Sequence, residues 1–219
     1  YSTFGSSTLK NVQPLAVDYG RGSMALAHNG NLVNAARLRE DLETQGHIFH
    51  ATTDSEVFLH LIARSQKERF CDSVADALTK VIGAYSLLVT NGEELVAVRD
   101  PYGFRPLWIG RLGGSYIFAS ETCALDIIDA DWDREVEPGE MVVVTRSGIE
   151  SFKPFPPVCP KACIFEFVYV ARPDSVVFGR SVDQVRKQLG RNLAKANPVE
   201  ADLVMAVPDS SNQVALGYA

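Results

Sequence analysis

Apolar residues in the first third of the chain follow first a strand-like and then a helix-like spacing. The run at 24–28 predicts a short buried strand that ends at a turn. From about residue 34, Leu38 and Leu42 fall one turn apart on one helix face, and Gly46 is placed to end that helix. A second helix is expected to begin within 53–56, and a third is expected to cover about 74–81.

After Gly83 the pattern changes to short strands. Two apolar runs flank Asn91-Gly92, a dipeptide that strongly favours a hairpin. Two further strands are expected at 107–109 and 116–119, and a short helix at 122–128. A second hairpin is expected to pair 141–145 with 149–152. Short strands with helices grouped near the start indicate an α+β fold in which stacked antiparallel sheets carry helices on the outside.

The segment 154–157, Pro-Phe-Pro-Pro, interrupts this pattern and is the best candidate for a linker. Beyond it, the spacing predicts a strand over 164–170, an amphipathic helix over 182–196 and a second strand over 202–207. A strand, a helix and a strand of this length are typical of the start of a parallel α/β unit.

Composition narrows the class of protein. Of 219 residues, 46% are hydrophobic and 22% are charged, as expected of a folded globular chain. The net charge of −6 argues against nucleic acid as a partner, because phosphate binding needs a basic surface. No apolar run approaches the roughly 20 residues needed to span a membrane, and no signal peptide is visible. We therefore expect a cytoplasmic location.

The four cysteines favour free thiols, because their spacings are uneven and a chain of this size can build a core without disulfides. They are Cys71, Cys123, Cys159 and Cys163. The last two form a C-x3-C pair, but one pair does not complete a four-ligand metal site.

The segment His28-Asn29-Gly30-Asn31 is the most informative candidate site. An Asn side-chain amide beside a Gly backbone N–H offers two donors that can converge on one oxygen, as an oxyanion hole requires. The same four residues also suit an ordinary turn. By themselves these residues favour the ordinary turn.

Residues 53–56, Thr-Asp-Ser-Glu, carry a similar ambiguity at the start of the second expected helix. Thr or Asp at a helix start with a nearby Glu is a capping arrangement. A carboxylate at this point could instead hold an ammonium group, but the segment by itself favours capping. Two other polar segments, 100–106 and 120–121, suit a rigid connection between strands and a helix cap.

Taken in order, several segments resemble the glutaminase domain of class-II glutamine amidotransferases. They are 1–3 (YST), 28–32 (HNGNL), 53–56 (TDSE), 83–86 (GAYS), 99–107 (RDPYGFRPL), 119–121 (ASE) and 137–140 (EPGE). Two later runs, 163–175 and 207–210, resemble the amidophosphoribosyltransferase family in particular. The resemblance covers essentially the whole chain.

This resemblance implies a fold and a division into domains. Residues 1–152 would form a four-layer αββα glutaminase domain of the N-terminal-nucleophile type that lacks its N-terminus. Residues 158–219 would begin an α/β phosphoribosyltransferase domain. The implied activity is glutamine-dependent formation of 5-phosphoribosylamine from phosphoribosyl pyrophosphate, the first committed step of purine synthesis. Mg²⁺ and a homo-oligomer, a dimer or a tetramer, are also implied.

The resemblance assigns roles to four residues. Asn29 and the Gly30 N–H match the oxyanion-hole pair, Asp54 matches the carboxylate that holds the α-amine of glutamine, and Thr3 lies in the segment that lines the glutamine pocket. The family nucleophile is an N-terminal cysteine whose α-amine can serve as the base.

The sequence also departs from the family pattern. Tyr1 stands at the start, no cysteine of the chain lies in the nucleophile's motif, and no phosphoribosyl-pyrophosphate loop precedes Ala219. We therefore expect a fragment that is inactive alone. The alternatives are another class-II amidotransferase or a non-catalytic glutamine-binding module. Cys163 matches a 4Fe–4S ligand of one subgroup, and a structural thiol is an equal interpretation.

Overall fold

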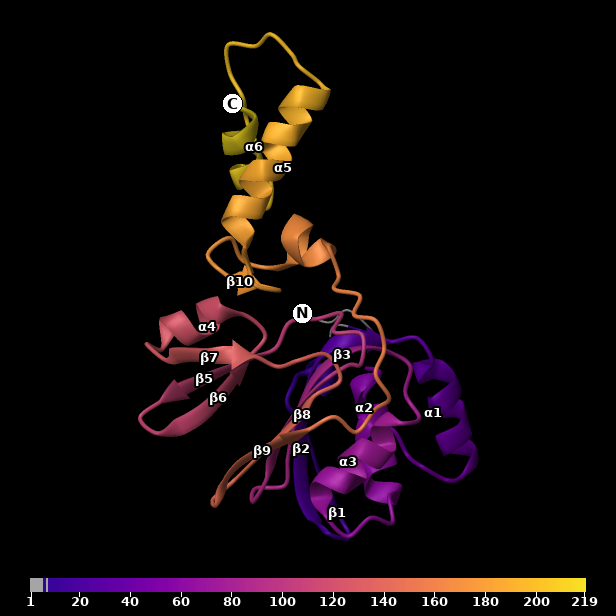
Figure 1. Cartoon of the computed structure of the whole chain (residues 1–219). Coiled ribbons are helices and arrows are strands. Elements are labelled where there is room, and N and C mark those ends of the chain that lie inside the picture. The colour runs from indigo at the N-terminus through magenta and orange to yellow at the C-terminus, as the bar shows by residue number, and fades with distance from the viewer. Residues whose placement is uncertain (1–5, 7) are drawn as a thin grey trace. The chain divides into compact units, whose positions relative to one another are not determined.

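The computed structural model of the chain describes residue 6 and residues 8–219, which fall into two compact units (Figure 1). The first unit holds the described residues up to Arg105 together with Val136–Lys161, and the second holds Pro106–Glu135 together with Ala162–Ala219. The division differs from the expected boundary between 152 and 158, because 106–135 groups with the C-terminal part. The assignment of the two functional domains stays a prediction.

A six-stranded antiparallel sheet forms the first unit, with the strand order β1-β2-β3-β4-β8-β9. The strands are β1 (Leu15–Tyr19), β2 (Gly22–Leu32), β3 (Gly83–Thr90), β4 (Leu95–Arg99), β8 (Met141–Thr145) and β9 (Gly148–Phe152). Both expected hairpins, β3–β4 and β8–β9, are confirmed. The strand expected at 24–28 is longer than its apolar run, since β2 continues to Leu32.

Three helices accompany this sheet: α1 (Ala35–Thr44), which contacts α2, then α2 itself (Ser55–Arg64) and α3 (Phe70–Leu78). A short 3-10 turn, η1 (Leu9–Asn11), precedes the first strand. Figure 1 shows α2 and α3 side by side against one face of the sheet. Phe58 and Ile62 of α2 and Val74 of α3 are buried against Leu26 and Leu87 of the sheet. This is the amphipathic packing that the helical spacing predicted, with α3 a few residues earlier than expected.

The second unit contains a three-stranded antiparallel sheet in the order β6-β5-β7. Its strands are β5 (Trp108–Leu112), β6 (Ser115–Ala119) and β7 (Asp131–Glu135), and α4 (Thr122–Ile127) lies between the last two in sequence. The remaining elements are η2 (Glu166–Val170), the hairpin β10 (Val176–Val177) and β11 (Arg180–Ser181), and the helices α5 (Val182–Ala196) and α6 (Asn212–Tyr218). The long helix expected at 182–196 is confirmed as α5.

The strand expected over 164–170 is wrong, because η2 is a π-helical turn. Its apolar residues fit either element, and the hydrogen-bonding partners decide between them. The backbone N–H of Ala171 donates to the Glu166 carbonyl at 3.0 Å. Buried Arg186 donates to the carbonyls of Phe167, at 2.6 Å, and Ala171, at 2.8 Å. The guanidinium thus holds the helical turn in place.

The strand expected over 202–207 is also wrong, since this segment forms no regular element. Leu203, Met205 and Val207 alternate as in a strand, but their exposed fractions are 73%, 81% and 81%. No strand in the described part of the chain pairs with them. The apolar alternation therefore lacks the neighbour that a strand needs, and the parallel unit expected here does not form.

Within the residues that the structure describes, no helix is long and apolar enough to cross a membrane. All four cysteines are free thiols, as expected, with Cys71 and Cys123 buried and Cys159 exposed.

Candidate active site

The end of β2 carries His28, Asn29 and Gly30, and its pairing with β3 fixes where each one lies. Asn29 is opposite Ser86 and Gly30 is opposite Tyr85. Successive side chains of a strand point to opposite faces of a sheet. His28 is buried on the face that carries the helices, so Asn29 belongs to the other face, where it is half-buried.

Gly30 stands where a side chain would not fit. Its φ of +153° favours glycine, and a Cβ atom would overlap the carbonyl oxygen of Ala84 and lie 2.8 Å from His28 Nε2. The simple turn considered from the sequence is wrong, because residues 28–31 are paired strand. Packing against Ala84 and His28 therefore accounts for glycine at this position, and the catalytic role of Asn29 and Gly30 stays a prediction.

Asp54 precedes α2 and has no side-chain capping hydrogen bond. Its Oδ2 instead accepts the backbone N–H of Leu32 at 2.8 Å, and its Oδ1 accepts from the Thr53 hydroxyl at 3.3 Å. The capping interpretation of this carboxylate is therefore wrong. The contact with Leu32 brings Asp54 to the strand end that carries Asn29 and Gly30.

The carboxylate of Asp54 is deeply buried, with an exposed fraction of only 3%. An ionised carboxylate offers about four acceptor positions, so its contacts with Leu32 and Thr53 leave capacity for a further donor. Substrate binding by Asp54 stays a prediction.

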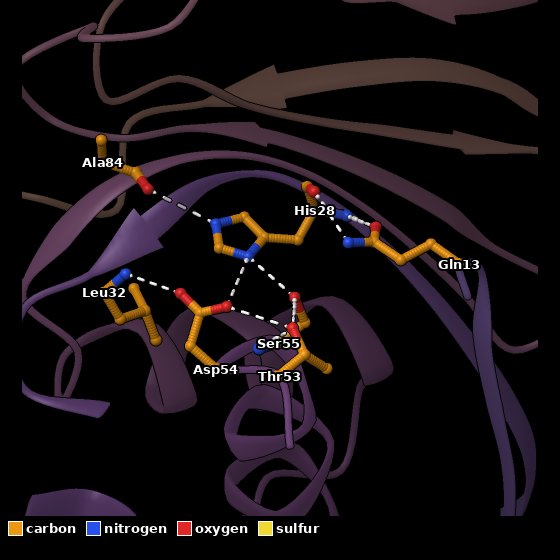
Figure 2. A network of polar contacts seen from close by, with 7 residues as sticks. All are labelled: Gln13, His28, Leu32, Thr53, Asp54, Ser55 and Ala84. Atoms are coloured by element: carbon orange, nitrogen blue, oxygen red, sulfur yellow. Dashed lines mark hydrogen bonds and ion pairs between the residues drawn. The ribbon is translucent and has the colours of Figure 1, made fainter. Parts of the chain in front are cut away.

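His28 connects the strand end to the helix start, as Figure 2 shows. Its Nδ1 lies 3.0 Å from Ser55 Oγ and 3.8 Å from Asp54 Oδ1, and its Nε2 lies 3.4 Å from the Ala84 carbonyl oxygen. A carbonyl oxygen only accepts, so Nε2 carries a proton. Gln13 holds the backbone of the same residue, because its amide nitrogen donates to the His28 carbonyl at 3.1 Å.

Burial lowers the pKa of His28 below its usual value of 6.5 and outweighs the opposing effects of Asp54 and the Ala84 carbonyl. The imidazole is therefore neutral near pH 7. In the resulting tautomer Nε2 donates to Ala84 and Nδ1 accepts the hydroxyl proton of Ser55. Three segments distant in sequence, β2, β3 and the start of α2, thus share one buried polar network.

The loop 100–106 is the rigid connection that its sequence predicts, and two buried side chains build it. Asp100 accepts the backbone N–H groups of Tyr102, at 3.0 Å, and Phe104. The Arg99 guanidinium donates to the carbonyls of Gly103, at 3.1 Å, and Arg105, at 2.7 Å. The positive charge of Arg105 in this loop makes a small contribution to the lowered pKa of His28.

Sequence reasoning did not identify the partners of His28. Ser55 and Ala84 lie 27 and 56 residues further along the chain, outside the motif that contains His28. The signal that could have found them is a polar residue at a core position of β2, because a buried imidazole requires hydrogen-bonding partners.

Two predicted site residues lie elsewhere. Thr3 falls outside the described residues. Cys163 precedes η2 in the second unit and is a half-buried free thiol. A 4Fe–4S cluster needs four ligands, and the described residues contain no group of three or more His, Cys, Asp or Glu arranged for a metal. The residues present do not form a cluster site on their own, and the cluster and Mg²⁺ stay predictions.

Comparison with known proteins decides the family. Residues 6–126 match the family described as a glutamine amidotransferase domain. The chain belongs to this family. Along its whole length it is 53% identical to chloroplastic amidophosphoribosyltransferase 2 of Arabidopsis thaliana and 46% identical to the amidophosphoribosyltransferase of Bacillus subtilis. It covers 39% and 46% of those two proteins, which is less than half of their length.

Solved structures place this glutamine amidotransferase domain in the expected fold class. The glutamine phosphoribosylpyrophosphate amidotransferase of B. subtilis, in complex with ADP and GMP, superposes with a TM-score of 0.93 at 45% identity. The match covers 97% of this chain and 47% of that one. A second structure, described as the allosteric regulatory enzyme of purine biosynthesis, gives a TM-score of 0.94. The α+β glutaminase fold is therefore confirmed.

Proposed function

We propose that the protein containing this chain forms 5-phosphoribosylamine from phosphoribosyl pyrophosphate, with ammonia obtained by hydrolysis of glutamine. The observation that carries the proposal is identity of about half of all residues, along the entire chain, to proteins named amidophosphoribosyltransferase. The polar network that joins Asp54 and His28 beneath Gly30 supports the glutaminase half of the reaction.

The glutaminase step assigns a function to each predicted residue. A cysteine thiolate outside this chain attacks the side-chain amide carbon of glutamine, and the developing oxyanion accepts hydrogen bonds from the Asn29 side chain and the Gly30 N–H. The C–N bond then breaks, the nitrogen takes up a proton and leaves as ammonia, and water hydrolyses the glutamyl thioester to glutamate. Asp54 holds the α-ammonium group of glutamine, and Thr3 lines the pocket.

Ammonia then displaces pyrophosphate from phosphoribosyl pyrophosphate in a second domain, with Mg²⁺ bound there. We also propose that the intact protein is a homo-oligomer. The cytoplasmic location stays a prediction, and the Arabidopsis relatives are named as chloroplastic.

One experiment separates this proposal from its alternatives. Glutamine is titrated calorimetrically into the full-length protein, and release of glutamate and of pyrophosphate is followed in parallel. Release of both supports the proposal. Binding of glutamine without release of glutamate would favour a non-catalytic glutamine-binding module, and glutamate release without consumption of phosphoribosyl pyrophosphate would favour another class-II amidotransferase. The 219-residue chain alone is expected to release no glutamate.

A further inference from the structure

The buried side chain of Asn11 joins two segments that are distant in the sequence. Its Nδ2 donates to the Ser6 carbonyl, at 2.5 Å, and to Thr52 Oγ1, at 2.8 Å. Its Oδ1 accepts the backbone N–H of Thr52 at 2.9 Å. An asparagine amide has two donor and two acceptor positions, so three of the four are used between Ser6 and Thr52. These three residues form one junction.

The hydroxyl of Thr52 completes this junction. Besides the Asn11 amide, it accepts the backbone N–H of Ser6 at 3.1 Å, and its oxygen lies 3.1 Å from Ser6 Oγ. A hydroxyl has two acceptor positions and one proton, so these three contacts use all of them. Ser6 comes three residues after Thr3, and Thr52 comes two residues before Asp54. The junction therefore lies close in sequence to both residues that are assigned to glutamine binding.

Gln13, two residues further along, contacts the strand end that carries the predicted oxyanion donors. The backbone pairing of β1 with β2 stops at Leu15 opposite Leu26, and the same register continued would place Gln13 opposite His28. The Gln13 side chain takes over the pairing there, as Figure 2 shows. Its Oε1 accepts the His28 N–H at 2.5 Å, and its Nε2 donates to the His28 carbonyl at 3.1 Å. One side-chain amide thus replaces both hydrogen bonds of a backbone partner.

This contact matters because the end of β2 extends beyond its partner β1. From residue 28 to residue 32, the described backbone pairs β2 with β3 alone. Gln13 holds the free edge of the strand at His28, directly before Asn29. The strand end is therefore fixed on both edges immediately before the two predicted oxyanion donors, Asn29 and Gly30.

We propose that Asn11 and Gln13 are positioning residues of the glutaminase site, an inference that rests on the proposed function. Asn11 acts on the substrate side, through the segment that leads into Asp54. Gln13 acts on the oxyanion side, through the strand residue next to Asn29. Both belong to one short segment, so this segment sets the position of the substrate's α-ammonium group relative to the oxyanion donors. Such geometry is sensitive, since a displacement of about 1 Å can cost about 10²-fold in rate.

The two residues should affect different kinetic constants. Asp54 holds the α-ammonium group in the ground state and in the transition state alike. Asn11→Ala should therefore raise the KM for glutamine roughly 3- to 10-fold, the effect of about one hydrogen bond, and leave kcat nearly unchanged. The oxyanion exists only in the transition state. Gln13→Ala should therefore lower kcat roughly 10- to 100-fold, less than complete loss of a donor, with little change in KM.

The test measures steady-state turnover of the full-length variants with glutamine and with ammonium chloride. Thr52→Val loses only the hydroxyl and should raise KM as Asn11→Ala does, whereas Thr52→Ser keeps the hydroxyl and should retain the parental KM. Val12→Ala is the matched control, because Val12 lies between the two positioning residues with an exposed fraction of 59%, and it should behave as the parent does. Activity with ammonia should be retained in every variant.

Amide hydrogen exchange of the same full-length proteins tests the hydrogen bonds without turnover. Gln13→Ala should speed exchange of the His28 N–H, and Asn11→Ala that of the Thr52 N–H, by about fivefold or more. Unchanged exchange would overturn the inference even in a protein that releases no glutamate, whereas a parent without glutamate release would overturn the proposed function.

Faster exchange with parental KM and kcat would also overturn the inference, because Asn11 and Gln13 would then support the fold alone. If an alanine variant fails to fold, the milder Thr52→Val and Gln13→Glu decide the question. Gln13→Glu keeps the acceptor for the His28 N–H and loses the donor to its carbonyl, so kcat should fall in the same direction.

Discussion

The carboxylate of Asp54 accepts the backbone N–H of Leu32 at 2.8 Å, although the two residues are 22 positions apart. This single hydrogen bond attaches the start of α2 to the end of β2. It also gives a buried N–H its acceptor, because Leu32 is 2% exposed and lies at the last position of its strand. A residue assigned to substrate binding therefore also supports the strand that carries Asn29 and Gly30.

Replacement of Asp54 should separate these two functions. Asp54→Ala leaves the Leu32 N–H buried without an acceptor, so the free energy of unfolding should fall by about 1–3 kcal/mol. Asp54→Asn retains one carbonyl oxygen for this N–H and should cost less. Urea unfolding of the chain measures both. Equal stability of Asp54→Ala and the parent would contradict the structural role.

In the full-length protein, Asp54→Asn should raise the KM for glutamine, because the amide no longer attracts the α-ammonium group. A charge-assisted hydrogen bond contributes about 1.5–3 kcal/mol, so the expected rise is roughly 10- to 150-fold. Activity with free ammonia should be retained, since it does not use the glutamine pocket. An unchanged KM would remove the assignment of Asp54 to the substrate's α-amine.

Stability should depend on pH through His28. Burial lowers the pKa of His28 in the folded chain below its unfolded value of about 6.5, so the unfolded state binds more protons as the pH falls below that value. The contribution of His28 is complete above pH 6.5 and is lost as the pH falls towards the lowered pKa. His28→Gln removes this titration.

Comparison of the parent with His28→Gln isolates the effect, because His60 also has a lowered pKa and titrates in both proteins. At pH 7 the variant should be less stable by about 1 kcal/mol, the typical net contribution of a hydrogen bond. This difference in stability should shrink as the pH falls from about 7 to 5. Over that range the parent loses stability because its buried His28 has to stay uncharged, and the variant has no such group at this position. Urea unfolding at several pH values measures it, and a difference that grows at low pH would show that the folded state favours the charged imidazole.

Gly30 should tolerate no side chain. In Gly30→Ala the new Cβ overlaps the Ala84 carbonyl, and the φ of +153° adds strain, so the strand end has to shift. Overpacking of this kind costs about 1–3 kcal/mol of stability. Gly20→Ala is the matched control, because nothing lies within 4 Å of its Cβ position, and a change within about 0.5 kcal/mol is expected there. Thermal unfolding of both variants is the measurement.

The sequence predicted correctly those elements whose apolar spacing and end signals lie close together in the chain. The hairpin of β3 and β4 depends on Asn91-Gly92, and α1 on the spacing of Leu38 and Leu42 before Gly46. Strand β7 escaped prediction because four of its five residues are charged and its pairing partner β5 begins 23 residues earlier. Segments 164–170 and 202–207 have strand-like composition without a strand beside them.

The candidate site shows the same limit. The positions of Asn29, Gly30 and Asp54 followed from the order of short motifs. The network of His28 and Asp54 beside them did not, because His28 meets Ser55 and Ala84 only after the sheet and α2 have packed. Contacts between residues so distant depend on tertiary structure and leave no periodic signal in the sequence.

Asn29 provides the sharpest test of the proposed chemistry. Its side chain belongs to the sheet face opposite His28, so its removal should leave the buried network of His28, Ser55 and Asp54 intact. Loss of one oxyanion-hole donor usually costs about 10²–10³ in rate. Asn29→Ala in the full-length protein should therefore lower glutamine-dependent turnover by roughly 100-fold or more, with activity from free ammonia preserved.

A second variant of Asn29 distinguishes loss of a donor from loss of shape. Asn29→Asp keeps the size of the side chain but replaces the donor by an anion that repels the developing oxyanion. Its glutamine-dependent turnover should fall at least as far as that of Asn29→Ala, again with ammonia-dependent activity retained. Steady-state assays with glutamine and with ammonium chloride make both comparisons. If Asn29→Asp turns over glutamine like the parent, Asn29 is not an oxyanion donor, and an equal loss of both activities would indicate a folding defect.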